Sequence, residues 1–228
     1  MQPFLEFIHE ENRESSFVFY EVLLDQEKGS YWHYHADVEI SLIHEGSGLC
    51  FVGDHVGRFK QNQLVLLGRD LPHDFNSNHD VAPAKQLIIR FSHDIVSQFA
   101  EFEAIHAMLE EAEYGLIFSD FDPAISEKIA NFSTIGDTRR LVELFSILHL
   151  LSKHEPEKRR RLSSIRFSKG TRFYNSDLRL RNVLAHIHEN LDRQISLDEV
   201  AEFTHLTKPS FCRWFKKTMR CSFVTYVN

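Results

Sequence analysis

The spacing of hydrophobic residues changes near residue 93, and this change constrains the fold more than any other feature of the sequence. Before that point, short apolar or alternating runs are separated by turn-forming residues, as in Glu45-Gly46-Ser47-Gly48. Several short strands at this spacing are typical of an antiparallel barrel or sandwich. The runs predict strands at residues 17–24, 39–43, 49–52, 63–67 and 86–91.

After residue 93, apolar residues recur every three or four positions, which predicts amphipathic helices. One helix is expected over residues 95–108 and another over residues 141–151. A third, shorter helix is expected after Asp122 and Pro123, because aspartate can cap a helix and proline fits its first turn. The predicted fold class is therefore α+β, with an N-terminal antiparallel β-barrel, middle helices and a C-terminal all-α unit.

Charge is divided unevenly along the chain. Residues 157–228 hold 15 Lys and Arg against 7 Asp and Glu, whereas residues 1–156 hold 11 against 26. A basic segment joined to an acidic one indicates a nucleic-acid-binding module beside a domain that does not contact phosphate. A solvated basic linker is the alternative, because Lys158 to Arg161 supply four of the charges. We place an interdomain linker at residues 155–176, which are dense in Lys, Arg and Ser.

Targeting and redox signals both predict a soluble cytoplasmic protein. No run approaches the ~18 apolar residues of a membrane span, and the acidic residues that follow Met1 do not suit a signal peptide. Cys50, Cys212 and Cys221 form neither a CxxC pair nor an even disulfide framework.

The sequence also lacks a GxSxG elbow, a P-loop and a Rossmann glycine fingerprint, so the enzyme classes that use them have no support.

A pair of short helices is predicted near the C-terminus. Ser196 and Glu199 form a capping box, in which the serine accepts from the amide of residue 199 and the glutamate reaches back to the amide of residue 196. Thr207 can cap a second helix, with Pro209 in its first turn. Two short helices joined tightly are the expected unit, spanning about residues 196–219.

A helical wheel divides the second helix into an aromatic face and a basic face. Phe211, Trp214 and Phe215 lie on the first, which should pack. A helix with a basic face can contact phosphates and base edges in the major groove of DNA. A helical hairpin with a solvated basic face is the alternative. The candidate DNA contacts are Lys208, Pro209, Cys212, Arg213, Lys216 and Lys217.

The stretch from Ile195 to Asn228 resembles the first half of the DNA-binding domain of AraC-type transcription regulators, and residues 182–191 resemble the helix that precedes it. Two departures accompany the resemblance. Arg220 stands where the family has the glycine that ends the recognition helix, and the sequence ends before the family's second helix-turn-helix. We therefore expect a fragment, or a protein with weakened DNA binding, because half of the unit makes fewer contacts.

A second set of residues resembles the two motifs of the cupin barrel. Residues 32–39 have the sequence W-H-Y-H-A-D-V-E, and Pro72-His73 follows later. The resemblance implies that His33, His35, Glu39 and His73 converge on a divalent metal, for which Zn, Mn, Fe and Ni are the candidates. The alternative is that these side chains only hydrogen-bond one another. Together with Trp32 they are also the candidate effector-binding residues, and Phe51, Phe59 and Phe75 could line the same pocket.

These observations predict a DNA-binding transcription regulator of the AraC family, not an enzyme, that responds to a small-molecule effector. The resemblance implies a polar metabolite such as a sugar, and the middle helices are expected to form a homodimer. A metal-dependent cupin enzyme with a vestigial DNA-binding segment is the alternative. The expected domains are a cupin-like barrel at 1–93, a helical segment at 94–154, the linker at 155–176 and the DNA-binding segment at 177–228.

Overall fold

The computed structural model describes residues 4–5, 16–24, 32–77, 83–97, 99–167, 183, 186–187, 190, 193, 195–219 and 222–227. The chain divides into two compact units, one made of residues 3–170 and the other of residues 1–2 and 171–228. Within the described ranges, every helix is too short or too polar to cross a membrane.

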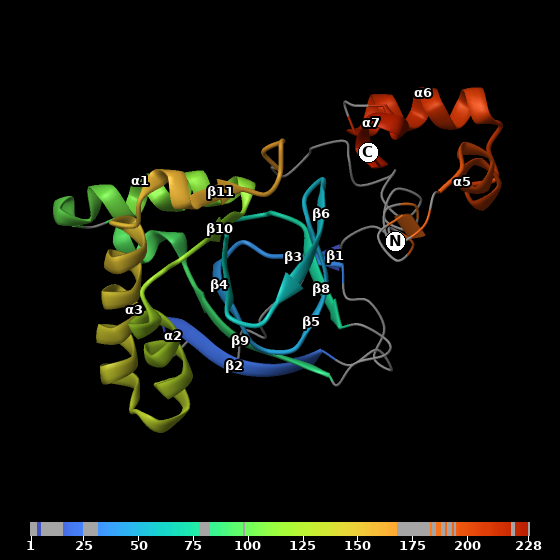
Figure 1. Cartoon of the computed structure of the whole chain (residues 1–228). Coiled ribbons are helices and arrows are strands. Elements are labelled where there is room, and N and C mark those ends of the chain that lie inside the picture. The colour runs from blue at the N-terminus through green and yellow to red at the C-terminus, as the bar shows by residue number, and fades with distance from the viewer. Residues whose placement is uncertain are drawn as a thin grey trace. The chain divides into compact units, whose positions relative to one another are not determined.

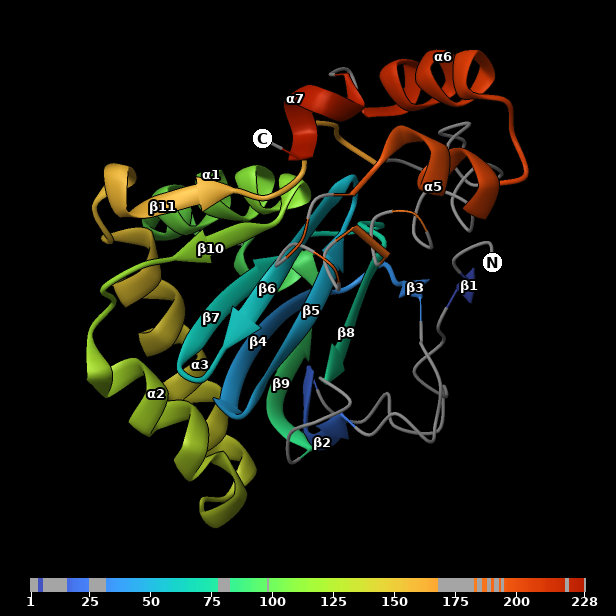
Figure 2. The ribbon, with the colours of Figure 1, turned by 45° about the vertical axis from the view of Figure 1, so that its right-hand side comes forward.

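The larger unit contains two β-sheets, which curve around a shared interior (Figures 1 and 2). One has the strand order β1-β3-β8-β5-β6 and the other β11-β10-β7-β4-β9-β2. All neighbouring strands are antiparallel except β1 and β3. The strands are β1 (Phe4–Leu5), β2 (Phe17–Leu24), β3 (His33–Tyr34), β4 (Val38–Glu45), β5 (Ser47–Val52), β6 (His55–Lys60), β7 (Gln63–Leu67), β8 (His73–Ser77), β9 (Ala84–Phe91), β10 (Leu116–Phe118) and β11 (Arg159–Arg161).

Strand β4 shows how the sequence sets the two faces of the six-stranded sheet. Val38, Ile40 and Leu42 belong to a core that they share with residues of the helices. Because successive side chains of a strand point to opposite faces, Glu39 and Ser41 turn toward the barrel interior. The first six residues of the strand are buried, so both of its faces are covered although its sequence alternates apolar and polar residues from Val38 to Leu42.

Three helices pack along the outer face of the six-stranded sheet: α1 (Glu103–Glu111), α2 (Pro123–Ala130) and α3 (Asp137–Ser152) (Figure 1). Asp122 caps α2 as predicted, since its Oδ1 accepts from the amide of Ala124 at 2.9 Å. The helix expected over residues 95–108 is shorter, because the first part of that stretch forms two 3-10 turns before α1 begins. The α+β fold class is confirmed.

The segment that was expected to be a linker begins inside the sheet. Residues 159–161 form β11, which pairs with β10 so that Arg160 lies opposite Ile117. The prediction of a linker from residue 155 failed because an edge strand needs only backbone partners, and here its arginines bond to Glu111 at 3.1 Å. Phe167 is buried as well, so the larger unit extends at least that far. Residues 168–176 lie outside the described ranges.

The smaller unit contains α5 (Leu197–Phe203), α6 (Lys208–Met219) and α7 (Phe223–Val227). Ser196 caps α5, because its Oγ accepts from the amide of Glu199 at 3.1 Å. The Glu199 side chain does not complete the expected capping box but bonds to Arg193 and His186. Thr207 caps α6 as predicted, because its Oγ1 accepts from the amide of Ser210 at 3.4 Å. Most of residues 182–191, which resemble the helix that precedes the family's helix-turn-helix, lies outside the described residues, as do Arg220 and Cys221.

Val200, Phe211 and Phe215 form the centre of this small unit and are fully buried. Phe223 of α7 packs edge-on against Phe215, with ring centroids 5.8 Å apart. Phe203, the last residue of α5, is 44% exposed. The buried face of α6 therefore follows the helical wheel.

Candidate functional site

The structure brings together the four residues that resemble a cupin metal centre. His33 lies in β3, His35 follows that strand, Glu39 lies in β4 and His73 begins β8. His33 stands opposite His73 in the sheet register, and Glu39 points toward them from the other sheet. Each residue offers one donor atom, and these atoms all lie within 4.8 Å of one another. The histidines and Glu39 are all nine-tenths buried or more.

Backbone carbonyls fix the orientation of two of these rings. His35 donates from Nδ1 to the carbonyl of Asp37 at 3.0 Å, and His73 donates from Nδ1 to the carbonyl of Leu71 at 2.8 Å. A carbonyl can only accept, so the proton of each neutral ring lies on Nδ1 and the Nε2 lone pair faces inward. Both Nε2 atoms face Glu39 Oε2, at 3.2 and 3.7 Å. Two nitrogen lone pairs that face a carboxylate oxygen repel it. The cluster therefore requires positive charge, either from added protons on the rings or from a cation between the donor atoms.

Arg90 supplies one positive charge, and the sequence analysis missed it. Its Nε donates to Glu39 Oε2 at 2.9 Å, and its Nη2 lies 3.2 Å from His33 Nε2. Arg90 stands directly opposite Glu39 in the β4–β9 register, which explains the contact. A charged residue inside the apolar run of β9 was the available signal, because a buried charge needs a partner.

Glu39 is held in its ionised form. Burial alone would raise the pKa of this carboxyl, but the adjacent His35 and His73 rings and the charge of Arg90 outweigh burial and hold the pKa well below its usual value. The carboxylate therefore remains negative inside the barrel at neutral pH.

The donors fit a divalent metal ion. Donor atoms around a tetrahedral zinc ion lie about 3.3 Å apart, close to the separations between Glu39 and the two inward Nε2 atoms. His73 Nε2 has no hydrogen-bond partner among the described residues, which leaves it available as a ligand. The carbonyl bonds at Nδ1 are the outer contacts that orient metal-binding histidines. His35, Glu39 and His73 would hold the ion, whereas His33 already contacts Arg90.

The aromatic residues expected in the effector pocket are part of the barrel core. Trp32 is 4% exposed, and its Nε1 has no hydrogen-bond partner in the described part of the chain. Phe51, Phe59 and Phe75 are also buried, and the last two pack with ring centroids 5.8 Å apart. These rings stabilise the interior around the histidine cluster.

A polar cavity of about 500 Å³ opens beside the cluster, and no sequence motif predicted it. Asp70 in its wall donates its amide to the carbonyl of His35 at 2.8 Å, and Asp37 in the same wall accepts from the His35 ring. The cavity therefore shares loops with the buried cluster. Its lining residues are Ala36, Asp37, Arg69, Asp70, Ser92, His93, Asp94, Glu113, Arg166 and Phe167.

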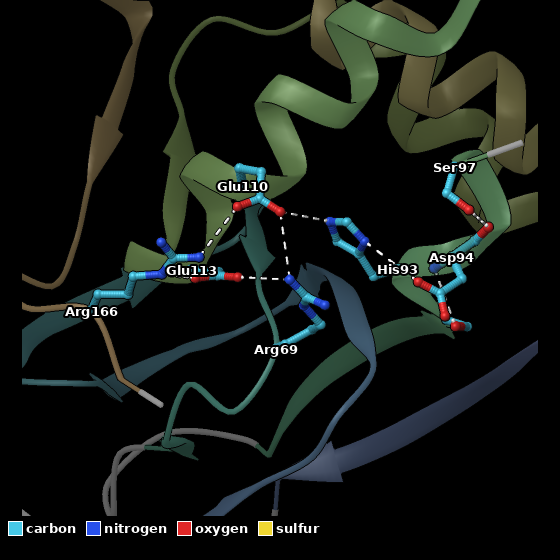
Figure 3. Close-up of polar contacts among 8 residues, drawn as sticks. Arg69, His93, Asp94, Ser97, Glu110, Glu113 and Arg166 are labelled. Atoms are coloured by element: carbon cyan, nitrogen blue, oxygen red, sulfur yellow. Dashed lines mark hydrogen bonds and ion pairs between the residues drawn. The ribbon is translucent and has the colours of Figure 1, made fainter. Parts of the chain in front are cut away.

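A network of ion pairs forms one side of this cavity (Figure 3). Arg69 bonds to Glu113 at 3.1 Å and to Glu110 at 3.5 Å, and Arg166 bonds to both carboxylates. His93 lies on the opposite side of Glu110, with Nε2 3.3 Å from Oε1. Burial, followed by the nearby charge of Arg69, lowers the pKa of His93, so its ring is neutral over a wider pH range than usual.

Helix α6 presents all six candidate DNA contacts at its surface. Each of Lys208, Pro209, Cys212, Arg213, Lys216 and Lys217 is exposed. Lys208 pairs with Asp198 of α5 at 2.5 Å, and Arg213 contacts Ser210 on its own helix. The opposite face of α6 is anchored by Phe211 and Phe215. The basic face is thus exposed on a helix whose other face is fixed by packing.

Residues 22–127 match the AraC-like ligand binding domain family. Solved structures similar to the chain include a cupin 2 conserved barrel domain protein from Rhodopseudomonas palustris, with 26% identity over 33% of this chain and 50% of that one and a TM-score of 0.28. Hydroxypropylphosphonic acid epoxidase from S. wedmorenis is 20% identical over 33% of this chain and 42% of its own, with a TM-score of 0.29.

ToxT from Vibrio cholerae, solved with a bound unsaturated fatty acid, is 12% identical over 93% of this chain and 76% of its own, with a TM-score of 0.43. The alignments with the barrel protein and the epoxidase span about half of those chains or less. No protein with a curated description matched the sequence. The match over residues 22–127 shows that this part of the chain is similar to an AraC-like ligand binding domain.

Proposed function

We propose that the chain is a cytoplasmic transcription regulator that binds DNA through α6 and responds to a small polar effector held by its larger unit. The DNA-binding part of this proposal rests on the amphipathic character of α6. Arg213, Lys216 and Lys217 are exposed, whereas Phe211 and Phe215 on the other face are fully buried. An arginine on such a helix can bond two acceptors of guanine, and lysines can neutralise phosphates.

The effector part rests on the ligand binding domain and on the chemistry of the cavity. Asp37, Asp70, Asp94 and Glu113 supply acceptors to its wall, and Arg69 and Arg166 supply donors. A wall with so many charged groups favours a polar molecule, such as a sugar, over an apolar one. A homodimer joined through the middle helices would allow the effector to change the spacing of two DNA-binding units, provided that it binds one arrangement better.

A DNA-binding titration across salt concentrations tests this function. Duplexes enriched from a random pool by the full chain are compared with random duplex. Lys216→Ala should reduce the slope of log affinity against log salt by about 1, because one phosphate contact is lost. Arg213→Ala should cost about 1–3 kcal/mol on enriched duplex and less on random duplex.

Lys153→Ala is the matched control, because Lys153 is an exposed lysine at the end of α3. This variant should bind as the unaltered chain does. Absence of binding, or a salt response that Lys216→Ala leaves unchanged, would refute the proposed role of α6.

The buried histidine cluster favours a second candidate, a metal-dependent cupin enzyme. That function requires a bound ion and loses turnover when the ion is removed. A regulator that does not depend on the ion keeps its DNA affinity after exhaustive chelation. DNA titration of chelated protein therefore separates the two candidates, since an enzyme with a vestigial helical segment shows no specific DNA binding before or after chelation.

A further inference from the structure

A second group of metal-binding side chains lies outside the barrel cluster. His93 is in a short 3-10 turn, His93–Val96, that follows β9, and His106 and Glu110 lie on α1. The latter two are four residues apart, so they share one face of the helix. The three residues each offer one donor atom, and the three atoms lie within 4.8 Å of one another.

The geometry of His93 points to a ligand at this position. The residue is 6% exposed, yet its Nε2 has no hydrogen-bond partner in the described part of the chain. Figure 3 shows this nitrogen directed at Glu110, whose Oε1 lies 3.3 Å away. That separation equals the distance of about 3.3 Å between two donors of a tetrahedral zinc ion. His106 and Glu110 are half-buried, which leaves a side open for solvent and ions.

A metal ion would disturb few existing contacts. Glu110 Oε1 also receives Arg69 at 3.5 Å, but the shorter bond of Arg69 is the one to Glu113 at 3.1 Å. Arg166 uses the other oxygen of Glu110. An ion at Oε1 would therefore displace only the long contact from Arg69.

The surrounding charge favours a cation. The wall of the neighbouring cavity contains four carboxylates, those of Asp37, Asp70, Asp94 and Glu113, against the guanidinium groups of Arg69 and Arg166. Asp94 also places Oδ1 4.0 Å from His93 Nδ1. A carboxylate on the far side of a metal-binding imidazole is a common outer contact that orients the ring.

We propose that His93, His106 and Glu110 bind a Zn²⁺ ion, with water at the fourth position. Two imidazole nitrogens and one carboxylate oxygen are a donor set that zinc uses in proteins. The ion joins the turn after β9 to α1. The ion also replaces Arg69 as the partner of Glu110 Oε1. The positive charge of Arg69 at the cavity wall is then less neutralised by Glu110.

Calorimetric titration of the full chain with Zn²⁺ tests the proposal. His106→Ala should remove one class of zinc sites, or weaken it by at least about 100-fold, since even the loss of an outer partner costs up to that factor. His149→Ala is the control, because His149 is an exposed histidine on α3. It should retain every zinc site of the unaltered chain.

Glu110→Gln provides an independent variant of nearly the same shape, and it should show the same loss as His106→Ala. Circular dichroism without zinc verifies that each variant is folded. Any zinc bound by the barrel cluster remains in all three variants and is counted separately. Equal zinc stoichiometry and affinity in His106→Ala and His149→Ala would overturn the proposal, as would an unaltered chain whose only zinc site is lost on substitution of His73.

Discussion

The buried pair of Arg90 and Glu39 provides a quantitative test of the barrel interior. Arg90→Met keeps an unbranched side chain but leaves the Glu39 carboxylate without its guanidinium. Removing one partner of a buried ion pair costs about 3–5 kcal/mol. The two side chains are 4% and 2% exposed, so solvent cannot replace the lost contact. Arg90 also lies over the ring of Tyr20, 5.4 Å from its centroid, which favours the upper part of that range.

This loss corresponds to a fall of roughly 6–20 °C in the melting temperature of a domain of this size. Urea unfolding followed by tryptophan fluorescence measures it. The chain has two tryptophans, Trp32 in the larger unit and Trp214 in α6. A Trp214→Phe background therefore makes the signal specific for the larger unit.

A double-variant cycle separates the cost of an unpaired charge from the cost of lost packing. Glu39→Gln combined with Arg90→Met removes both charges and should recover at least half of the stability that Arg90→Met loses. The reasoning fails if Arg90→Met stays within about 1 kcal/mol of the unaltered chain. It also fails if the double variant is no more stable than Arg90→Met alone.

Three further predictions concern the smaller unit. Phe215→Ala should cost about 3–5 kcal/mol, because a fully buried ring leaves a cavity, and far-ultraviolet circular dichroism on heating measures the loss. Ser196→Ala should cost about 1 kcal/mol in the same assay, because α5 loses its cap. Hydrogen bonds from Arg193 and then His186 lower the pKa of Glu199 from 4.5 to about 2. Its ionised form thus stabilises the fold above pH 4.5, and this contribution is lost as the pH falls toward 2. Glu199→Gln should flatten that part of the acid unfolding curve.

Controls for these variants come from the same helices. Phe203→Ala removes a ring that is 44% exposed and should cost much less than Phe215→Ala. Equal losses would show that Phe215 does not anchor α6. Ser196→Asp retains a capping oxygen and should keep most of the stability, so a loss equal to that of Ser196→Ala would argue against the cap. An unchanged acid curve in Glu199→Gln would mean that other carboxylates control unfolding there.

Local sequence patterns predicted the helices and strands of this protein better than they predicted the contacts between residues distant in sequence. The strands around Glu39 and Gln63, the cap at Asp122 and the amphipathic α6 all follow from residue periodicity or capping chemistry. Arg90 was missed because its partnership with Glu39 depends on strand register, which pairs residues 51 positions apart. The cavity beside His93 was missed for the same reason, since its wall combines five separate stretches of the chain.

The role of residues 159–161 shows the limit of reading composition alone. Three consecutive arginines resemble a solvated linker by charge, yet their backbone completes a sheet. The side chains of Arg159 and Arg161 pair with Glu111, which is distant in sequence, and no local pattern encodes that contact. Charge density therefore predicted exposure correctly for Arg160 and Arg161, but not that the segment is ordered.

The position of β11 also affects how the protein behaves at high concentration. It is a terminal strand of the six-stranded sheet, beyond the apolar β10. An uncovered strand edge is a template for pairing with another chain, and closely spaced positive charges oppose such pairing. The arginines of β11 thus protect the sheet from intermolecular β-aggregation. A fragment of the larger unit that ended before Arg159 would expose the backbone of Leu116–Phe118 and should precipitate, whereas one that extends through Phe167 keeps that edge covered.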